Sequence, residues 1–222
     1  MSERRGTPIA IPAAPDLGFE VQLWHNGVQH VAGIDEAGRG ALAGPVAAAA
    51  IIFPPDPSLS YILDGVRDSK QMSPQERSAW ARRLPGIALV WAVGFAEAAE
   101  IDILGIVPAT RLAVRRALSQ LSIQPDHLLV DYIRLPEVNI PQTSLVKGDA
   151  RSLSIAAASI LAKTSRDRLC RDLEAEYPDY GFARHKGYGT PFHLNALARL
   201  GPSPVHRQSF RPVAISAITR RS

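Results

Sequence analysis

Val31-Ala-Gly-Ile-Asp35-Glu36-Ala-Gly38-Arg39-Gly40 joins a short apolar run to two adjacent acids and a glycine-rich turn. The run from Val31 to Ile34 predicts a buried strand, and the two turn glycines allow the backbone to fold back tightly. Adjacent carboxylates at a strand end are costly, because like charges close together resist joint ionisation. A divalent cation removes that cost, and ligands that offer only oxygen favour Mg²⁺ or Mn²⁺.

The turn itself has the chemistry of a phosphate site. Its backbone leaves N–H groups free, and Arg39 adds a planar fork of donors that suits phosphate. Acids beside a phosphate-binding turn indicate phosphodiester chemistry. Taken alone, the stretch is equally consistent with a charged strand end that enters a glycine loop.

Two further acids stand at the ends of short apolar runs, Asp131 after 127–130 and Asp149 after 145–148. Acids at neighbouring strand ends can converge and hold two metal ions about 3.5–4 Å apart, one to prepare a water and one to stabilise the leaving oxygen. Either acid alone could be a loop cap, and Asp149 could start the helix that follows. Consecutive strand residues point to opposite faces, so Asp35 and Glu36 cannot both point inward in a regular strand.

The remaining pattern predicts an α/β fold with a mixed central sheet between helices. Strands are expected at 31–35, 46–53, 87–95 and 127–131, and helices at 73–84, 101–121 in two pieces, 152–177 and 191–200. The helix start at Ser73 is strongly marked, because Pro74 and Glu76 complete a capping box. Residues 1–28 are expected to be an extended or poorly ordered leader, 29–213 one domain, and 214–222 a basic tail.

Composition narrows the class of protein. The chain has 222 residues, 46% of them hydrophobic, which suits one domain with a substantial core. A net charge of +4 and a pI near 9.5 fit an anionic partner, although only weakly. Cys170 is the only cysteine, so no internal disulfide is possible and a reducing cytoplasm is expected. Neither a membrane span nor a secretory signal is visible.

Several motifs together make the sequence resemble bacterial ribonuclease HII across about residues 31–213. The motifs are Gly33–Gly40 with Gly44–Val46, Asp68–Lys70, Glu100–Asp102, Leu129–Asp131, Lys147–Asp149 with Ser154–Lys163, His185–Thr190, and His206-Arg207 with Ser209-Phe210. The joint pattern is far more specific than any single motif.

The resemblance implies an RNase H-like fold with a C-terminal helical region, and an endonuclease that uses Mg²⁺ or Mn²⁺. It implies cleavage of RNA paired to DNA, incision at single ribonucleotides in duplex DNA, and 5′-phosphomonoester products. The family's metal-binding acids match Asp35, Glu36, Asp131 and Asp149. Gly38, Arg39 and Gly40 match the turn that contacts the ribose 2′-hydroxyl, and Tyr188 matches the tyrosine that stacks at the RNA–DNA junction. The 2′-hydroxyl is what distinguishes RNA from DNA at a given site.

Other residues carry weaker expectations. Lys70 is expected to contact phosphate, with a solvated surface lysine as the alternative. His185 and His206 are weak candidates for acid–base roles, because a metal-bound water reduces the need for them. The sequence departs from the family at Tyr132, where glycine is usual, at Gly105, where asparagine is frequent, and at Gln208, where a basic residue is common.

Three alternatives remain beside this interpretation. A non-catalytic hybrid-binding module would not need a costly cluster of carboxylates. The related HIII type carries a substantial N-terminal binding domain, whereas this chain has a short leader. A resolvase-type metal nuclease would not need both the Gly38–Gly40 turn and Tyr188. The expected partners are RNA–DNA hybrid and ribonucleotide-containing DNA, with no membrane, and the chain is expected to be a monomer.

Overall fold

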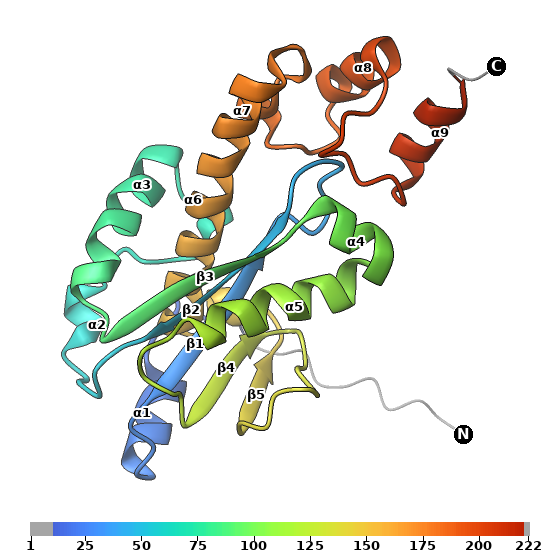
Figure 1. Cartoon of the computed structure of the whole chain (residues 1–222). Coiled ribbons are helices and arrows are strands. Elements are labelled where there is room, and N and C mark those ends of the chain that lie inside the picture. Colours follow the sequence, from blue (N-terminus) through green and yellow to red (C-terminus); the bar gives the residue numbers. More distant parts are fainter. Residues whose placement is uncertain (1–10, 220–222) are drawn as a thin grey trace, which may run out of the picture.

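A mixed five-stranded sheet forms the centre of the molecule in the computed structural model, which describes residues 11–219 (Figure 1). The strands are β1 (Val31–Ala37), β2 (Val46–Ile52), β3 (Val90–Ala96), β4 (His127–Asp131) and β5 (Gln142–Leu145), in the order β3-β2-β1-β4-β5. β1, β2 and β3 are antiparallel neighbours, whereas β4 and β5 run parallel to β1. The sheet therefore has the mixed character that the sequence predicts.

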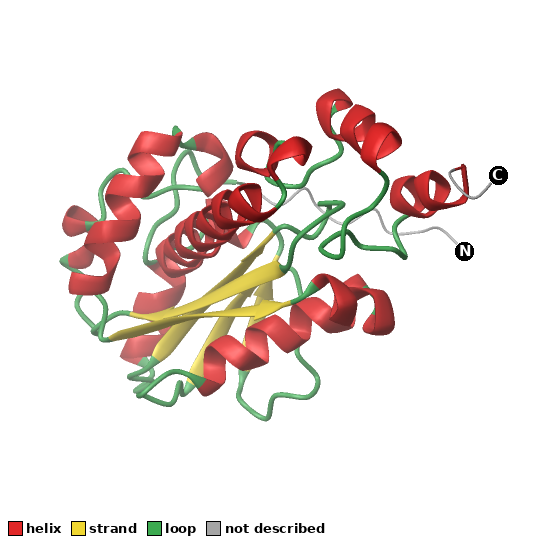
Figure 2. Cartoon of the chain, turned by 45° about the horizontal axis from the view of Figure 1, so that its top comes forward, coloured by secondary structure: helices red, strands yellow, loops and turns green. Residues whose placement is uncertain are grey.

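Helices cover both faces of the sheet, as Figure 2 shows from above. One face packs against α6 (Leu153–Glu176), with α1 (Gly18–His25), α2 (Leu59–Ile62) and α3 (Pro74–Arg83) around it. The other face packs against α5 (Ile106–Ser119), which follows α4 (Ala98–Leu104). The central strands are consequently buried on both faces, which explains their near-continuous apolar runs.

Small residues let the two long helices lie close to the sheet. A Cβ on Gly33 of β1 would come within 2.2 Å of the Ser154 backbone in α6, and one on Gly94 of β3 within 2.2 Å of the Ala113 carbonyl in α5. Any larger side chain at either position would push a helix off the sheet. This close approach brings the N-terminus of α6 to the strand ends that carry the acids.

A C-terminal helical region lies beyond α6, as expected from the sequence. It consists of α7 (Phe182–His185), α8 (Pro191–Leu200) and α9 (Arg211–Thr219). Short 3₁₀ turns at Ser69–Gln71, Leu84–Gly86, Gly148–Ala150 and Pro178–Tyr180 connect the larger elements. The Ser73 capping box at the start of α3 is confirmed, with both of its hydrogen bonds present.

The expected extended leader is wrong where the structure describes it. Residues 18–25 of the expected leader form α1, which buries Glu20 and Trp24. The sequence pattern did not predict this helix because its buried face includes a polar residue. Residues 214–219 of the expected tail belong to α9. Residues 1–10 and 220–222 lie outside the described part of the chain. The third strand begins at Val90 rather than at residue 87, because a 3₁₀ turn fills 84–86.

No helix within residues 11–219 is long and apolar enough to cross a membrane. Cys170 is buried in α6 as a free thiol. Trp24 and Trp80 are buried, whereas Trp91 on the edge strand β3 is partly exposed.

Candidate active site

Three carboxylates meet at one end of the sheet. One oxygen from each of Asp35, Asp131 and Asp149 lies within 4.8 Å of the other two. Asp35 and Asp131 are brought together by strand pairing, because Ile34 of β1 is in register with Val130 of β4, one residue before each acid. Both acids therefore leave neighbouring parallel strands at the same edge, as the sequence predicts.

The side-chain alternation of the strands explains why Glu36 is not in this group. Val31 and Leu129 pack on the α6 side of the sheet, so Asp35 and Asp131, at even spacings from them, point to that side. Ile34 packs on the α5 side, and Glu36 follows it. Glu36 still lines the same cleft, where its Oε1 accepts a hydrogen bond of 3.2 Å from Arg39 Nη1.

Asp149 reaches the group by a different route from the one expected. β5 ends at Leu145, and Asp149 sits in the 3₁₀ turn Gly148–Ala150 that precedes α6. The helix cap is Ser152, whose hydroxyl accepts from the Ile155 N–H at 3.2 Å, so Asp149 is not a cap. The Gly148 N–H donates to Asp131 Oδ1 at 2.7 Å, which ties the turn to the end of β4.

The group is electrostatically expensive in the absence of a cation. Burial, followed by the charges of Glu36 and Asp131, raises the pKa of Asp35 well above its usual range. Burial also raises the pKa of Asp131 and of Asp149, against the hydrogen bond from Gly148 in the first case. A divalent cation would offset this repulsion, and three carboxylates that offer only oxygen fit Mg²⁺ or Mn²⁺.

Lys70 supplies part of the missing positive charge. Its Nζ lies 3.3 Å from Asp149 Oδ2 and 3.8 Å from Asp68 Oδ1, while 75% of its side chain remains exposed. Burial works against the charged form, yet Asp68 and Asp149 together raise the pKa of the Lys70 ammonium. The structure thus places Lys70 beside the acids in this cleft. The phosphate contact expected of Lys70 remains a prediction.

The glycine turn lines the cleft beside the acids. Gly38 has φ = +91°, which favours glycine, and a Cβ there would lie 1.9 Å from Arg166 Nε. Arg207 donates to the Gly38 carbonyl at 2.7 Å and to the Arg39 carbonyl at 2.8 Å. The turn, which ends at Gly40, is therefore fixed from behind by two guanidinium groups.

Arg166 and Arg207 are the site residues that the sequence interpretation missed. Both are fully buried and bond to backbone carbonyls, Arg166 to those of Ala43, Pro45 and Lys186 at 2.9–3.1 Å. Burial, followed by the charge of Arg166, lowers the pKa of Arg207. The sequence did contain a sign that Arg166 is buried. It falls four residues after Ala162, on the apolar face of the long helix.

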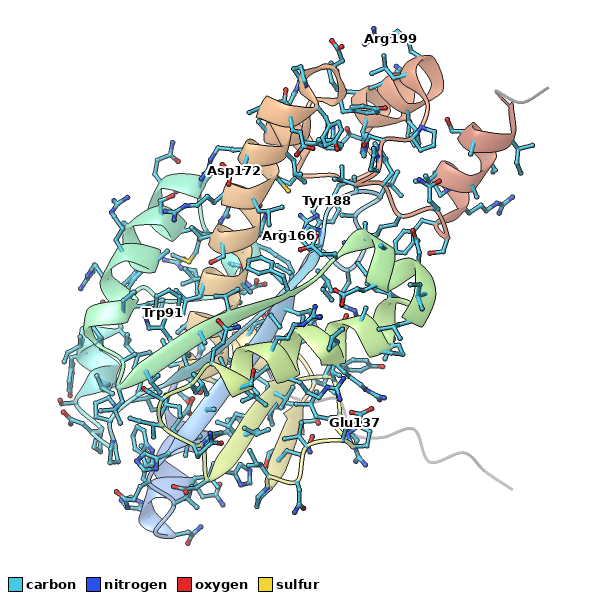
Figure 3. All side chains as sticks on the ribbon, in the orientation of Figure 1. Trp91, Glu137, Arg166, Asp172, Tyr188 and Arg199 are labelled. Atoms are coloured by element: carbon cyan, nitrogen blue, oxygen red, sulfur yellow. The ribbon has the colours of Figure 1, made fainter. Side chains whose placement is uncertain are left out.

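Tyr188 faces the same cleft from the C-terminal region. Its ring is 37% exposed and lies 5.5 Å from the Arg166 guanidinium, an arrangement visible in Figure 3. Gly187 has φ = +76°, and a Cβ there would come within 2.4 Å of the Ala43 carbonyl. The loop therefore sits tightly on the β1–β2 connection, with the tyrosine ring turned toward the cleft.

The two histidines considered for acid–base roles lie outside the cleft lining. His206 Nδ1 bonds to Ser203, and its Nε2 lies 3.0 Å from His193 Nε2. Burial and the neighbouring His193 lower the pKa of His206 to about 4. His185 Nε2 lies 2.7 Å from the Tyr180 carbonyl, so both rings serve packing.

The three departures from the family pattern fall around the site. Tyr132 is exposed with φ = +58° and lines a second hollow beside the acids. Gly105, with φ = +81°, forms the junction of α4 and α5. The Gln208 N–H donates to Asp102 Oδ2 at 2.8 Å, so its backbone anchors the segment before α9.

Comparisons with known protein families and sequences all point to the same family. The sequence model of the family described as Ribonuclease HII matches residues 32–213. A ribonuclease HII of Desulfitobacterium hafniense is 53% identical over 197 residues, which cover 89% of this chain and 74% of that protein. One from Dehalococcoides mccartyi is 48% identical over 205 residues, covering 91% and 97% of the two chains.

Solved structures extend the similarity to the fold. The ribonuclease H2 of Pyrococcus horikoshii superimposes with a TM-score of 0.75 at 26% identity, covering 87% of this chain and 99% of that one. A Bst-RNase HIII solved with Mn²⁺ has a TM-score of 0.67 at 18% identity, covering 88% and 71%, and shows the shared fold alone. The chain belongs to the ribonuclease HII family of endonucleases, which hydrolyse RNA in RNA–DNA hybrids.

Proposed function

We propose that this protein is a divalent-metal-dependent endonuclease that also incises duplex DNA at single ribonucleotides and produces 5′-phosphomonoesters. The observation that carries the proposal is the meeting of Asp35, Asp131 and Asp149 within 4.8 Å in a cleft of about 800 Å³. The Gly38-Arg39-Gly40 turn and the exposed Tyr188 line that same cleft. No other described part of the chain combines these three features.

Mg²⁺ or Mn²⁺ is the proposed cofactor, held by Asp35, Asp131 and Asp149 with Glu36 at the margin. When bound, the cation neutralises the carboxylates, activates water and stabilises charge on the phosphoryl group. The protein's own contribution is to hold the acids ready, through strand pairing and the Gly148 hydrogen bond. A two-metal arrangement suits four acids, and Lys70 would then be free to leave Asp149 for a phosphate.

Sugar selection is assigned to the Gly38-Arg39-Gly40 turn and Tyr188. Backbone groups of the turn can approach a ribose closely at Gly40, where an added Cβ would point into open space, while Gly38 leaves room for Arg166 behind the turn. Tyr188 packs on the neighbouring deoxyribose, whose face lacks the hydroxyl that would obstruct a ring. Arg166, which lies under the tyrosine and behind Gly38, couples the two recognition elements.

The same proposal takes the chain as a cytoplasmic monomer. The buried free thiol of Cys170 suits a reducing compartment.

A nicking assay tests the proposal directly. Purified protein is incubated with Mg²⁺ or Mn²⁺ and a duplex that carries one ribonucleotide, and the nick is mapped by denaturing electrophoresis. We expect a single incision beside the ribonucleotide, no cut in an all-DNA duplex, and no activity in excess EDTA. Cleavage of the all-DNA duplex, or cleavage in EDTA at the same rate, would contradict the proposal.

A further inference from the structure

A strongly basic pocket lies between α3, α6 and α7, outside the group of acids. Its volume is about 340 Å³, and α3 and α7 each pack against α6, which lies between them in Figure 1. The charged residues that line it are Arg77, Lys163, Asp167, Arg171, Arg184 and Lys186. Five cations therefore surround one carboxylate in a hollow that the proposed reaction does not use.

The floor of the pocket is one face of α6. Lys163, Asp167 and Arg171 follow one another at four-residue spacing, so their side chains stack along the helix. The Lys163 ammonium bonds to Asp167 Oδ1, which uses the only carboxylate among the charged residues of the pocket. Arg171, one turn further along, has no ion pair among the residues that the structure describes.

Residues on the walls of the pocket add further positive charge and no negative charge. Arg77 directs its guanidinium to the carbonyls of Ser69 at 2.8 Å and Met72 at 2.5 Å, and Arg184 lies over the Phe192 ring. Neither arginine forms an ion pair within residues 11–219. Like charges so gathered repel one another, and an anion in the pocket would relieve that repulsion.

The pocket continues the active-site cleft. Lys163 lines both hollows, and Lys186 lines the pocket two residues before Tyr188 lines the cleft. The acids sit near the N-terminus of α6, whereas the pocket extends from Lys163 to Arg171, about 12 Å along the helix at 1.5 Å per residue. A strand that leaves the acids and passes Tyr188 therefore runs into the pocket.

We propose that this pocket binds a backbone phosphate of the duplex on the deoxyribose side of the cut. The proposal rests on the function proposed above, in which Tyr188 packs on the deoxyribose next to the ribonucleotide. Phosphate oxygens suit the arginine forks of Arg171 and Arg184, and a diester supplies the negative charge that the pocket lacks. The contact fixes the position of the strand and reads no base.

The test measures duplex affinity of the double variant Arg171→Gln/Arg184→Gln, in which both side chains are exposed and the fold should persist. Arg82→Gln/Arg115→Gln, at exposed arginines of α3 and α5 outside the pocket, is the control for the loss of two charges. All proteins carry Asp35→Asn to prevent cutting, and binding is followed by fluorescence anisotropy at several salt concentrations. The probes carry one neutral methylphosphonate, placed at successive positions on each side of the ribonucleotide.

We expect the double variant to bind the unmodified duplex about tenfold more weakly, with a salt slope lower by about 0.9, the value for one phosphate contact. One methylphosphonate on the deoxyribose side should weaken the parent and leave the double variant unaffected. Equal losses for the Arg171→Gln/Arg184→Gln variant and for the Arg82→Gln/Arg115→Gln control, or equal sensitivity at every position, would overturn the proposal. A third outcome would also overturn it: inorganic pyrophosphate raises the Tm of the parent but not of the double variant, and no methylphosphonate position changes the affinity for duplex. The pocket would then bind small anions and not the duplex backbone.

The parent enzyme's nicking of the same unmodified duplex keeps the two proposals separate. Nicking at the ribonucleotide together with an unchanged affinity of the double variant overturns the pocket alone. Absence of nicking overturns the proposed function, while the binding measurements still report whether the pocket contacts phosphate.

Discussion

Asp35 shows how a single residue can be kept for activity at the expense of stability. Its carboxyl is buried beside Glu36 and Asp131, and within residues 11–219 it accepts one hydrogen bond, from the Glu36 N–H at 2.7 Å. The folded protein therefore holds the Asp35 proton more tightly than the unfolded chain does. Without metal, stability is lost as pH rises from the unfolded pKa, near 3.9, through the raised folded value.

Asp35→Asn should consequently raise the Tm of the metal-free protein at pH 7.5, by roughly 2–4 °C for each kcal/mol regained. The gain should shrink as pH falls toward 4 and vanish below the unfolded pKa, where the parent carboxyl is protonated in both states. Cleavage should fall by about 100-fold or more, because a ligand charge is lost. Asp172→Asn, at an exposed site on α6, should change neither quantity, and a lower Tm for Asp35→Asn would contradict the argument.

Tyr188 permits a test of sugar recognition at the scale of one ring. Tyr188→Ala should slow incision at a lone ribonucleotide about tenfold more than cleavage of a long hybrid, where many sites compete; aromatic stacking is worth roughly 1–3 kcal/mol. Tyr188→Phe keeps the ring and should stay close to the parent on both substrates. Rates are compared under single turnover, and equal slowing of both substrates by Tyr188→Ala would make the tyrosine a packing residue.

At the scale of elements, sequence patterns succeeded where the signal was local. Ser73 and Glu76 identified the start of α3, and the apolar runs identified β1, β2 and β4. The acids Asp35 and Asp131 followed from those strands. The two-residue alternation of a strand also anticipated that Asp35 and Glu36 point to opposite faces. The patterns failed where a distant partner decides the outcome, as for Arg166, whose carbonyl partners are remote in sequence.

α1 is the clearest of these failures, because its buried face carries a carboxylate. Glu20 is almost fully buried, and its Oε1 accepts from the Ser152 hydroxyl at 2.6 Å and from the Ser154 N–H at 3.0 Å. Both partners lie at the N-terminus of α6, Ser152 three and Ser154 five residues after Asp149. A polar residue on the inward face of a helix breaks the apolar pattern, so the segment resembles a loop in sequence until the partners of that residue are known.

This contact makes α1 a support for the active site. Glu20→Ala should lower the free energy of unfolding by about 1–3 kcal/mol, because it leaves buried hydroxyls without an acceptor. Cleavage should fall as well, through displacement of the turn that carries Asp149. Chemical denaturation and nicking rates check both effects, with the surface variant Glu137→Ala as the control. If Glu20→Ala loses stability but keeps full activity, α1 supports only the fold.

At the scale of the whole molecule, the C-terminal region completes the site that the sheet begins. Arg207 reaches from the segment before α9 to three carbonyls of residues 38–44, and Arg166 reaches from α6 to the same connection. The glycine turn thus has its shape set by residues far along the chain. Substrate recognition is for this reason linked to the packing of the entire C-terminal half.

Arg207→Lys tests that linkage. A single ammonium cannot reproduce the fork that holds the Gly38, Arg39 and Gly44 carbonyls, so buried acceptors are left unpaired. We expect a loss of about 1–3 kcal/mol in stability. Discrimination between ribonucleotide-containing and all-DNA duplex should also decrease in a binding assay. Unchanged discrimination in the folded variant would show that the turn keeps its shape unaided.

The stability of the whole protein should depend on pH, because the clustered acids repel one another when ionised and a bound metal would offset that repulsion. Burial raises the pKa values of Asp35, Asp131 and Asp149, so the metal-free protein loses stability as pH rises through those values. A cation binds the ionised carboxylates and competes with protons for them. Millimolar Mn²⁺ or Mg²⁺ should therefore raise the Tm clearly at pH 8, and far less at pH 5. Scanning calorimetry on the parent and on Asp35→Asn provides the check, since the variant should lose most of the metal effect at pH 8. An equal metal effect at both pH values, or in both proteins, would mean that the cation binds elsewhere.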